Sequence, residues 1–180
     1  MSEWRRRIMT MTASDNEDVL YLGVDISKTV KMEFGKRIGD FKLVCKGITS
    51  SKTTTNAISL GSYTSGMYNN IDPGISFDFK YYSSLKTDLN VHCYTGKGSA
   101  DYVFKRKYIK HPFDFEAVYH ETGLIGTLMY GTMSLKATDS TGAVYEYENN
   151  RFGHYMIDMD AIYISAHSDL KIDYVKLIKL

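Results

Sequence analysis

The chain has 180 residues, enough for one domain with a buried core, and its 43% hydrophobic and 24% charged residues exclude wholesale disorder. The formal net charge is only +1, and no apolar run approaches the length that crosses a bilayer, which excludes a spanning helix. Because the sequence shows no signal peptide, and Cys45 and Cys93 lack paired metal-binding spacing, we expect a cytosolic protein with reduced thiols.

The first eighteen residues read as an arm with a basic, apolar tip followed by an acidic stretch. The tip consists of Trp4, Arg5, Arg6, Arg7, Ile8 and Met9. Three guanidinium groups can pair with phosphates or carboxylates, while the apolar side chains can enter a groove or a lipid interface. The pattern therefore indicates a membrane or self-association arm, and the alternative is a poorly ordered terminus with chance charges.

Short extended segments and one helix are expected in the first half of the domain. The expected strands are Val19 to Leu22, Thr29 to Phe34, Phe41 to Lys46 and Ile75 to Tyr81. Between them, Ala57, Leu60, Thr64, Met67 and Ile71 fall at helical spacing. This spacing predicts a helix over residues 51–70, despite its threonines and glycines.

The second half reads as alternating strands and turns, with residues 83–101 as an exposed loop. The expected strands are Tyr102 to Tyr108, Phe113 to Tyr119 and a long one from Leu124 to Thr138, with turns at Glu121 to Gly123 and Asp139 to Gly142. Residues 145–156 are assigned to a short helix. Met159 to Ala166 and Leu170 to Leu180 are expected to close the domain as a β-hairpin.

Charge is grouped in blocks along the chain. Residues 28–52 carry seven bases against two acids (7 − 2 = +5), residues 86–111 carry six against two (6 − 2 = +4), and residues 112–169 carry two against nine (2 − 9 = −7). If the blocks form separate faces, the molecule is bipolar and can pair with its own copies. The alternative is that the blocks interleave in space and cancel.

One basic, aromatic stretch in the body is the best ligand-binding candidate, and its cations are Lys105, Arg106, Lys107 and Lys110. These cations could engage nucleocapsid RNA, an acidic protein surface or anionic lipid, and the neighbouring rings could stack or insert. The alternative is a strand with a solvated basic face.

No pattern of residues points to catalysis, a metal or a cofactor. The segment Gly96-Lys97-Gly98-Ser99 lacks the hydroxyl residue after lysine and the first glycine of a phosphate-binding loop. The five histidines show no metal-ligand spacing, and no nucleophile elbow is present. We therefore expect no enzyme, although a site assembled from dispersed residues stays an open alternative.

The order of these segments resembles the matrix protein of rhabdoviruses, most closely the short matrix proteins of plant-infecting members of the cytorhabdovirus type. The strand Phe41 to Ile48 leads into the expected helix, and the strand Ile75 to Tyr82 leads into a loop that contains His92-Cys93. The segment Gly126 to Asp139 resembles the family's Gly-Thr-led strand ending at an acidic turn. Proline-rich budding motifs of animal-infecting members are absent, since the first proline is Pro73.

The resemblance implies an α+β fold, with one twisted antiparallel β-sheet packed against two or three α-helices. Residues 1–18 would be a flexible N-terminal arm and residues 19–180 a single globular domain. The implied function is a viral structural protein that self-associates, bridges the nucleocapsid to the inner face of an anionic membrane, condenses the nucleocapsid and supports budding.

Such a protein would lie in the virion beneath the envelope, in the host cytoplasm and at intracellular membranes. Its partners would be itself, the nucleocapsid and the membrane, with RNA as a further candidate. The alternative is a monomeric intracellular nucleic-acid-binding accessory protein, which would bind in a salt-sensitive way without oligomerising.

Overall fold

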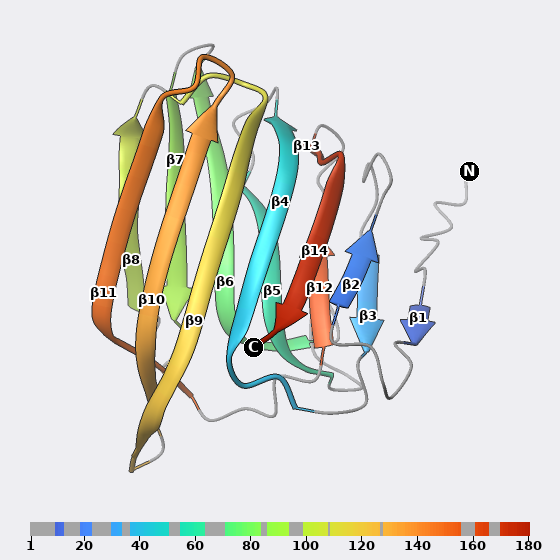
Figure 1. Cartoon of the computed structure of the whole chain (residues 1–180), viewed down its shortest axis with the longest axis vertical. Helices are drawn as coiled ribbons and strands as arrows, with labels where there is room; N and C mark the ends of the chain where they lie inside the picture. The colour runs from blue at the N-terminus through green and yellow to red at the C-terminus, as the bar shows by residue number, and fades with distance from the viewer. Residues whose placement is uncertain are drawn as a thin grey trace, which may run out of the picture.

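A computed structural model describes residues 10–12, 19–22, 30–33, 37–50, 55–63, 71–83, 86–93, 99–107, 109–126, 128–155, 161–165 and 170–180. Within these ranges every regular element is a β-strand. The strands form two seven-stranded sheets that lie one behind the other (Figure 1).

The first sheet has the order β1-β3-β12-β5-β6-β7-β8. Its strands are β1 (Thr10–Thr12), β3 (Val30–Glu33), β12 (Ala161–Ser165), β5 (Thr55–Tyr63), β6 (Ile71–Ser83), β7 (Lys86–Cys93) and β8 (Ser99–Lys107). All neighbours in it run antiparallel except β1 and β3, which are parallel.

The second sheet has the order β11-β10-β9-β4-β14-β2, and β13 pairs with the end of β4. Its strands are β11 (Val144–Tyr155), β10 (Leu128–Asp139), β9 (Phe113–Ile125), β4 (Phe41–Ser50), β14 (Tyr174–Lys179), β2 (Val19–Leu22) and β13 (Leu170–Lys171). Each neighbouring pair is antiparallel. Along β9, β10 and β14 buried residues alternate with half-buried or exposed ones, so one side of the sheet faces the core.

The core lies between the two sheets and is rich in aromatic rings. Phe115 on β9 contacts two rings of β6, with centroids 5.4 Å from Phe77 and 5.4 Å from Phe79. Phe113 packs on Phe79 at 5.8 Å. Because these side chains are almost fully buried, their removal from water is the main force that holds the sheets together.

The expectation of an α+β fold is wrong, because the described residues form strands and no helix. Part of the expected helix over residues 51–70 is strand β5, which pairs with both β6 and β12. Ile58 and Leu60 are both fully buried at a spacing of two, so the strand period places them in the core. Threonine is favourable in strands, and glycine is unfavourable in a helix interior, so the local sequence does not hold a helix here.

The short helix expected at residues 145–156 is also wrong, since this segment lies in strand β11. Tyr145 and Tyr147 pack against the core, while Glu146 and Glu148 are exposed. The loop expected at residues 83–101 contains β7 and the start of β8.

One turn and one hairpin differ from the expectation. Strand β9 continues through Glu121–Gly123 to Ile125, and β10 starts at Leu128, so the chain reverses at Gly126, whose φ is +64°. The expected closing hairpin does not form, because β12 pairs with β3 and β5 in the first sheet whereas β14 pairs with β4 and β2 in the second.

Several strand predictions are confirmed, namely those at residues 19–22, 41–46, 75–81 and 113–119. The turn at Asp139 to Gly142 is also confirmed, because the Gly142 N–H donates a hydrogen bond of 2.9 Å to the Asp139 carbonyl oxygen. Within the segment assigned to an N-terminal arm, residues 10–12 form β1 and pair with β3.

Candidate interaction surfaces

The solvent-facing side of the second sheet, here called the outer face, is broad and charged. Cross-strand register places a row of side chains along it, which reads Glu146, Lys136, Glu116, Val44 and Lys176 from β11 to β14. All five alternate with core residues of their own strands, which turn them away from the first sheet. The row therefore begins with an acid at one side of the face and ends with a base at the other.

Ion pairs on and beside this face join the basic block of residues 28–52 to the acidic block of residues 112–169. Lys42 contacts Glu116 at 2.9 Å, and Lys46 contacts Asp114 at 2.6 Å across the β4 and β9 pair. The Asp114 side chain also accepts a hydrogen bond from the Gly47 N–H at 3.1 Å. At these ion pairs the two blocks meet across β4 and β9 and do not form separate faces.

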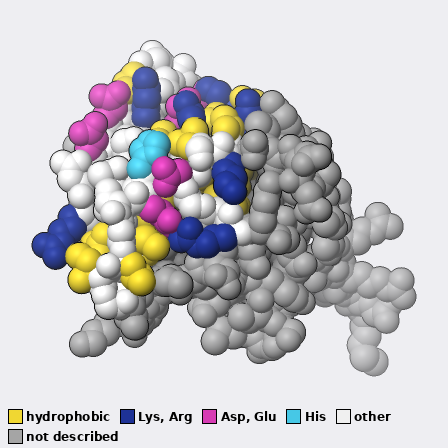
Figure 2. Space-filling view, turned by 60° about the horizontal axis from the view of Figure 1, so that its bottom comes forward, with side chains coloured by type: hydrophobic (Ala, Val, Ile, Leu, Met, Phe, Trp, Pro, Cys, Tyr) yellow, Lys and Arg dark blue, Asp and Glu magenta, His cyan; other side chains and the backbone are white. Residues whose placement is uncertain are grey.

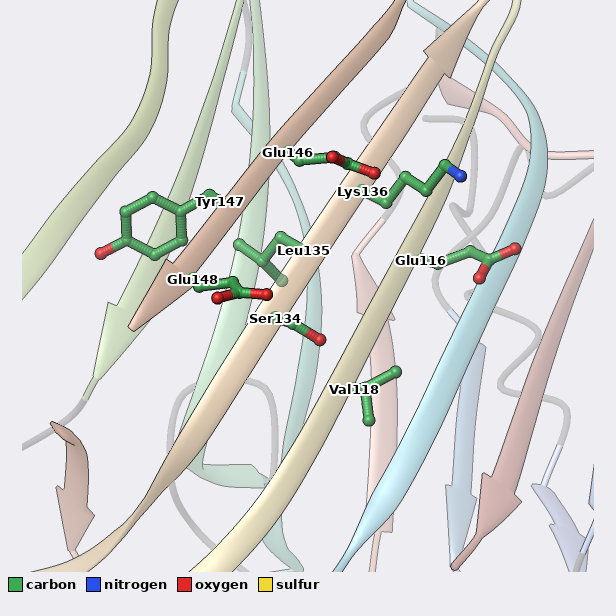
Figure 3. A pocket seen from close by; sticks show the side chains of 8 residues that line it. All are labelled: Glu116, Val118, Ser134, Leu135, Lys136, Glu146, Tyr147 and Glu148. Carbon is green, nitrogen blue, oxygen red and sulfur yellow. The ribbon is translucent and has the colours of Figure 1, made fainter. Parts of the chain in front are cut away.

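A shallow hollow of about 520 Å³ lies on the outer face over β9, β10 and β11. Figure 3 shows its side chains, with Glu146 and Lys136 on adjacent strands and Glu148 near Ser134. The remaining lining residues are Glu116, Val118, Leu135 and Tyr147. The hollow is open and mixes both signs of charge, which suits a protein surface better than an apolar small molecule.

The hairpin of β9 and β10 ends in an apolar tip, defined here as Leu124, Ile125, Leu128 and Met129 and called the hairpin tip. Leu124 is 50% exposed and Ile125 is 63% exposed, the largest exposed fraction among the exposed large hydrophobic side chains of the described residues. In Figure 1 this hairpin reaches below the other strands at the lower left. Exposed apolar side chains gathered at one point mark an interaction site more often than scattered ones do.

Polar groups surround the base of the hairpin. Arg37 Nη1 donates a hydrogen bond of 3.0 Å to Glu121 Oε2, and its Nη2 pairs with the other oxygen of the same carboxylate. His120 Nδ1 lies 3.1 Å from Asp40 Oδ2. Figure 2 shows the underside of the molecule, with a yellow hydrophobic group at its lower left edge and charged side chains above it.

Beside the tip, the Arg151 guanidinium carbon lies 5.4 Å from the centroid of the Tyr130 ring. This is the geometry of a cation–π contact, which joins an aromatic ring and a positive charge at the start of the apolar segment. The sequence reading missed the hairpin tip because it assigned Leu124 to Thr138 to a single strand. Two adjacent apolar residues bracketed by Gly123 and Gly126 were the available signal.

The predicted binding residues are placed only in part. The arm residues Trp4, Arg5, Arg6, Arg7, Ile8 and Met9 lie outside the described residues. Lys105, Arg106 and Lys107 belong to the edge strand β8, of which the backbone alone is described. Lys110 is exposed near the turn of Asp139, whose carboxylate accepts its backbone N–H at 3.3 Å. The binding roles of these residues stay predictions.

The described part of the chain shows no group of three or more His, Cys, Asp or Glu side chains that could hold a metal ion. In the same residues no helix is long and apolar enough to cross a membrane. No family model matches this chain, and no curated protein sequence matches it.

Proposed function

We propose that this chain is a structural protein of the viral matrix type, which self-associates and links a nucleocapsid to the inner face of a membrane. The observation that carries the self-association is the outer face, whose exposed acidic side chains Glu146 and Glu148 lie on the edge strand β11. The part of the resemblance that supports the viral role is the segment Gly126 to Asp139, which forms strand β10 (Leu128–Asp139) and ends at an acidic turn; the loop that contained His92-Cys93 is strand β7. The helices that the same resemblance implied are not part of the proposal.

The charge left on the outer face after internal pairing favours contact between copies. Glu116 and Asp114 pair with Lys42 and Lys46, whereas Glu146 lies opposite Lys136 and Glu148 lies opposite Ser134, so the charges of Glu146, Glu148 and Lys136 sum to −1 (1 − 2 = −1). Lys176 on β14 lies four strands away. At about 4.8 Å per strand this separation is ~19 Å, which exceeds the Debye length of about 8 Å at physiological salt.

Glu146 and Lys176 are therefore too far apart to pair within one copy, and the exposed carboxylates of β11 can attract a base on a second copy. A two-fold axis parallel to the strands would place β11 of one copy over β14 of the other. Attraction between single pairs of charges is weak and salt-sensitive. A two-fold contact closes at two copies, so it forms a dimer that a second, different contact would have to join into a layer.

Sedimentation velocity and electron microscopy of the purified full chain across a salt series test this proposal. Association should weaken from about 0.1 M to about 1 M salt, as the Debye length falls from about 10 Å to about 3 Å. The double variant Glu146→Gln with Glu148→Gln should associate less at low salt. Asp173→Lys is the matched control for net charge, because it adds the same two units of positive charge at an exposed residue before β14, away from β10 and β11.

A protein that stays monomeric at low salt and high concentration would refute the self-association. If that monomer also bound RNA in a salt-sensitive way, the nucleic-acid-binding accessory protein would replace the matrix reading.

A further inference from the structure

We propose that the hairpin tip inserts into the interfacial region of a lipid bilayer. This inference rests on the membrane role in the proposed function and names the element that makes the contact. Its residues are separate from the arm and from the basic stretch of β8, so it also adds a site to those predicted from the sequence.

The two faces of the hairpin tip are both apolar. Register pairs Ile125 with Leu128, and Leu124 with Met129. Because neighbouring residues of a strand point to opposite sides, one pair lies on each face of the hairpin. Strand β11 pairs with β10 at the same level and adds the positions of Tyr155 beside Leu128 and His154 beside Met129. A hairpin that docks on a protein surface needs one apolar face and leaves the other in water. Apolar side chains on both faces favour surroundings that are apolar on both sides, as in the acyl boundary of a bilayer.

Backbone hydrogen bonding at the tip lowers the cost of entering the apolar region of a bilayer. Strand β10 pairs with β9 as far as Leu128 with Ile125 and with β11 as far as Leu128 with Tyr155, so the backbone of β10 has a neighbouring strand on both sides at the tip. Gly126 completes the turn with a positive φ of +64°. An unsatisfied peptide group is costly in an apolar medium, and a paired hairpin reduces that cost.

The length and edges of the apolar segment also fit an interfacial depth. Two rungs at about 3.3 Å per residue reach ~7 Å, and interfacial segments bury their apolar side by about 5–10 Å. The next cross-strand pair is Gly123 with Tyr130, and the Arg151 guanidinium lies over the Tyr130 ring. An aromatic ring and a base at this level suit the headgroup region. Glu121, paired with Arg37, then marks the polar limit of insertion.

Vesicle flotation of the full chain tests the insertion with two lipid compositions. Phosphatidylcholine vesicles probe apolar insertion, and vesicles that also contain phosphatidylserine add the attraction of the basic residues. We expect binding to phosphatidylcholine that persists at about 1 M salt, where electrostatic attraction is screened. The double variant Leu124→Gln with Ile125→Thr should lose about 30-fold in partitioning, which corresponds to roughly 2 kcal/mol.

Val144→Thr is the matched control, because Val144 is 51% exposed and lies in a strand next to a different turn. Its binding should equal that of the unchanged chain. A second readout is the fluorescence of a single tryptophan introduced at the tip by Leu124→Trp. The native Trp4 is removed in the same chain by Trp4→Phe. Lipids brominated on their acyl chains should quench this fluorescence, and they should not quench Val144→Trp in the same background.

The inference is overturned if the double variant floats like the unchanged chain or if brominated lipids fail to quench at position 124. It is also overturned if the double variant loses self-association while its vesicle binding is unchanged, since the tip would then contact another protein copy. Sedimentation of the same variants separates the two proposals. Tip insertion by a strictly monomeric chain would refute only the self-association, and association without tip insertion would refute only this inference.

Discussion

Asp139→Asn should destabilise the fold through the turn that connects β10 and β11. The Asp139 side chain is 6% exposed and is the one buried polar or charged residue among those the structure describes. Its Oδ1 accepts hydrogen bonds from the Thr141 N–H at 2.8 Å, the Thr141 hydroxyl at 2.6 Å and the Ala143 N–H at 3.1 Å. Its Oδ2 accepts the Lys110 N–H at 3.3 Å, which ties the segment before β9 to this turn.

An asparagine can keep one acceptor oxygen, but its amide group would face the Lys110 N–H with a second donor. The variant therefore loses one hydrogen bond to a charged acceptor and weakens the others, because bonds to a neutral oxygen are about half as strong. We expect a loss of about 3 kcal/mol in the free energy of unfolding. With a urea slope of about 2 kcal/mol per molar, the midpoint should fall by ~1.5 M.

The pH dependence gives this prediction a second test. Burial raises the pKa of the Asp139 carboxyl, but the hydrogen bonds from Thr141, Lys110 and Ala143 lower it by more, so the net pKa is below its usual value. A group with a lowered folded-state pKa stabilises the fold above its unfolded pKa of about 3.9. That contribution is lost as the pH falls through the folded-state pKa, so the difference between the unchanged chain and Asp139→Asn should shrink below about pH 4.

Urea unfolding followed by circular dichroism at pH 7 and near pH 3 measures both effects. Thr141→Ala should cost about 1 kcal/mol, because it removes one hydroxyl bond and leaves the carboxylate in place. Ser140→Ala is the control at the exposed neighbour and should leave the midpoint unchanged. An Asp139→Asn midpoint equal to that of the Ser140→Ala control would refute this account of the turn.

Three further changes test the packing of the two sheets. Gly131→Ala should lower the free energy of unfolding by about 1–3 kcal/mol, because the added Cβ would lie 2.4 Å from the His120 carbonyl oxygen and from the Tyr119 ring. Gly39→Ala is the control, since its Cβ would meet only side-chain atoms at 3.4 Å or more. Phe115→Ala should lower the free energy of unfolding by about 3–5 kcal/mol, because it opens a cavity against Phe77 and Phe79. Val118→Ala on the opposite face of β9 is the control, and equal unfolding midpoints for the two variants would contradict the described core. In a Cys93→Ser background Cys45 should react with a thiol reagent only on unfolding, because its thiol is fully buried and burial raises its pKa. Rapid labelling of the native protein would contradict the burial of Cys45 in the core.

Strands with strict alternation could be predicted from the sequence because each encodes its own buried face. Phe113, Phe115 and Ala117 alternate with Asp114, Glu116 and Val118, and this order alone indicates a half-buried strand. The turn at Asp139 to Gly142 was equally local, since its side chain caps residues within four positions. The charge blocks were visible as well, but their pairing across β4 and β9 was not, because register is a long-range property.

The hairpin tip was visible only as a pair of apolar residues between glycines. Its role as an exposed end depends on β10 turning back along β9 at Gly126 and pairing Leu128 with Ile125. A single long strand through the same residues would have placed them within a sheet. The candidate site therefore depended on the position of one turn, which the sequence analysis assigned to Glu121 to Gly123 and which the structure places at Gly126.

The sequence by itself determined the strands that carry their own alternation. Tertiary structure decided the fold class, because residues 55–63 and 144–155 combine weak local preferences with apolar spacing that suits more than one period. Pairing of β5 with β6 and β12 gives its backbone groups partners on both sides, and β11 adds its tyrosines to the core. Those contacts join residues far apart in the chain, and their free energy outweighs the helical spacing that the local sequence suggested.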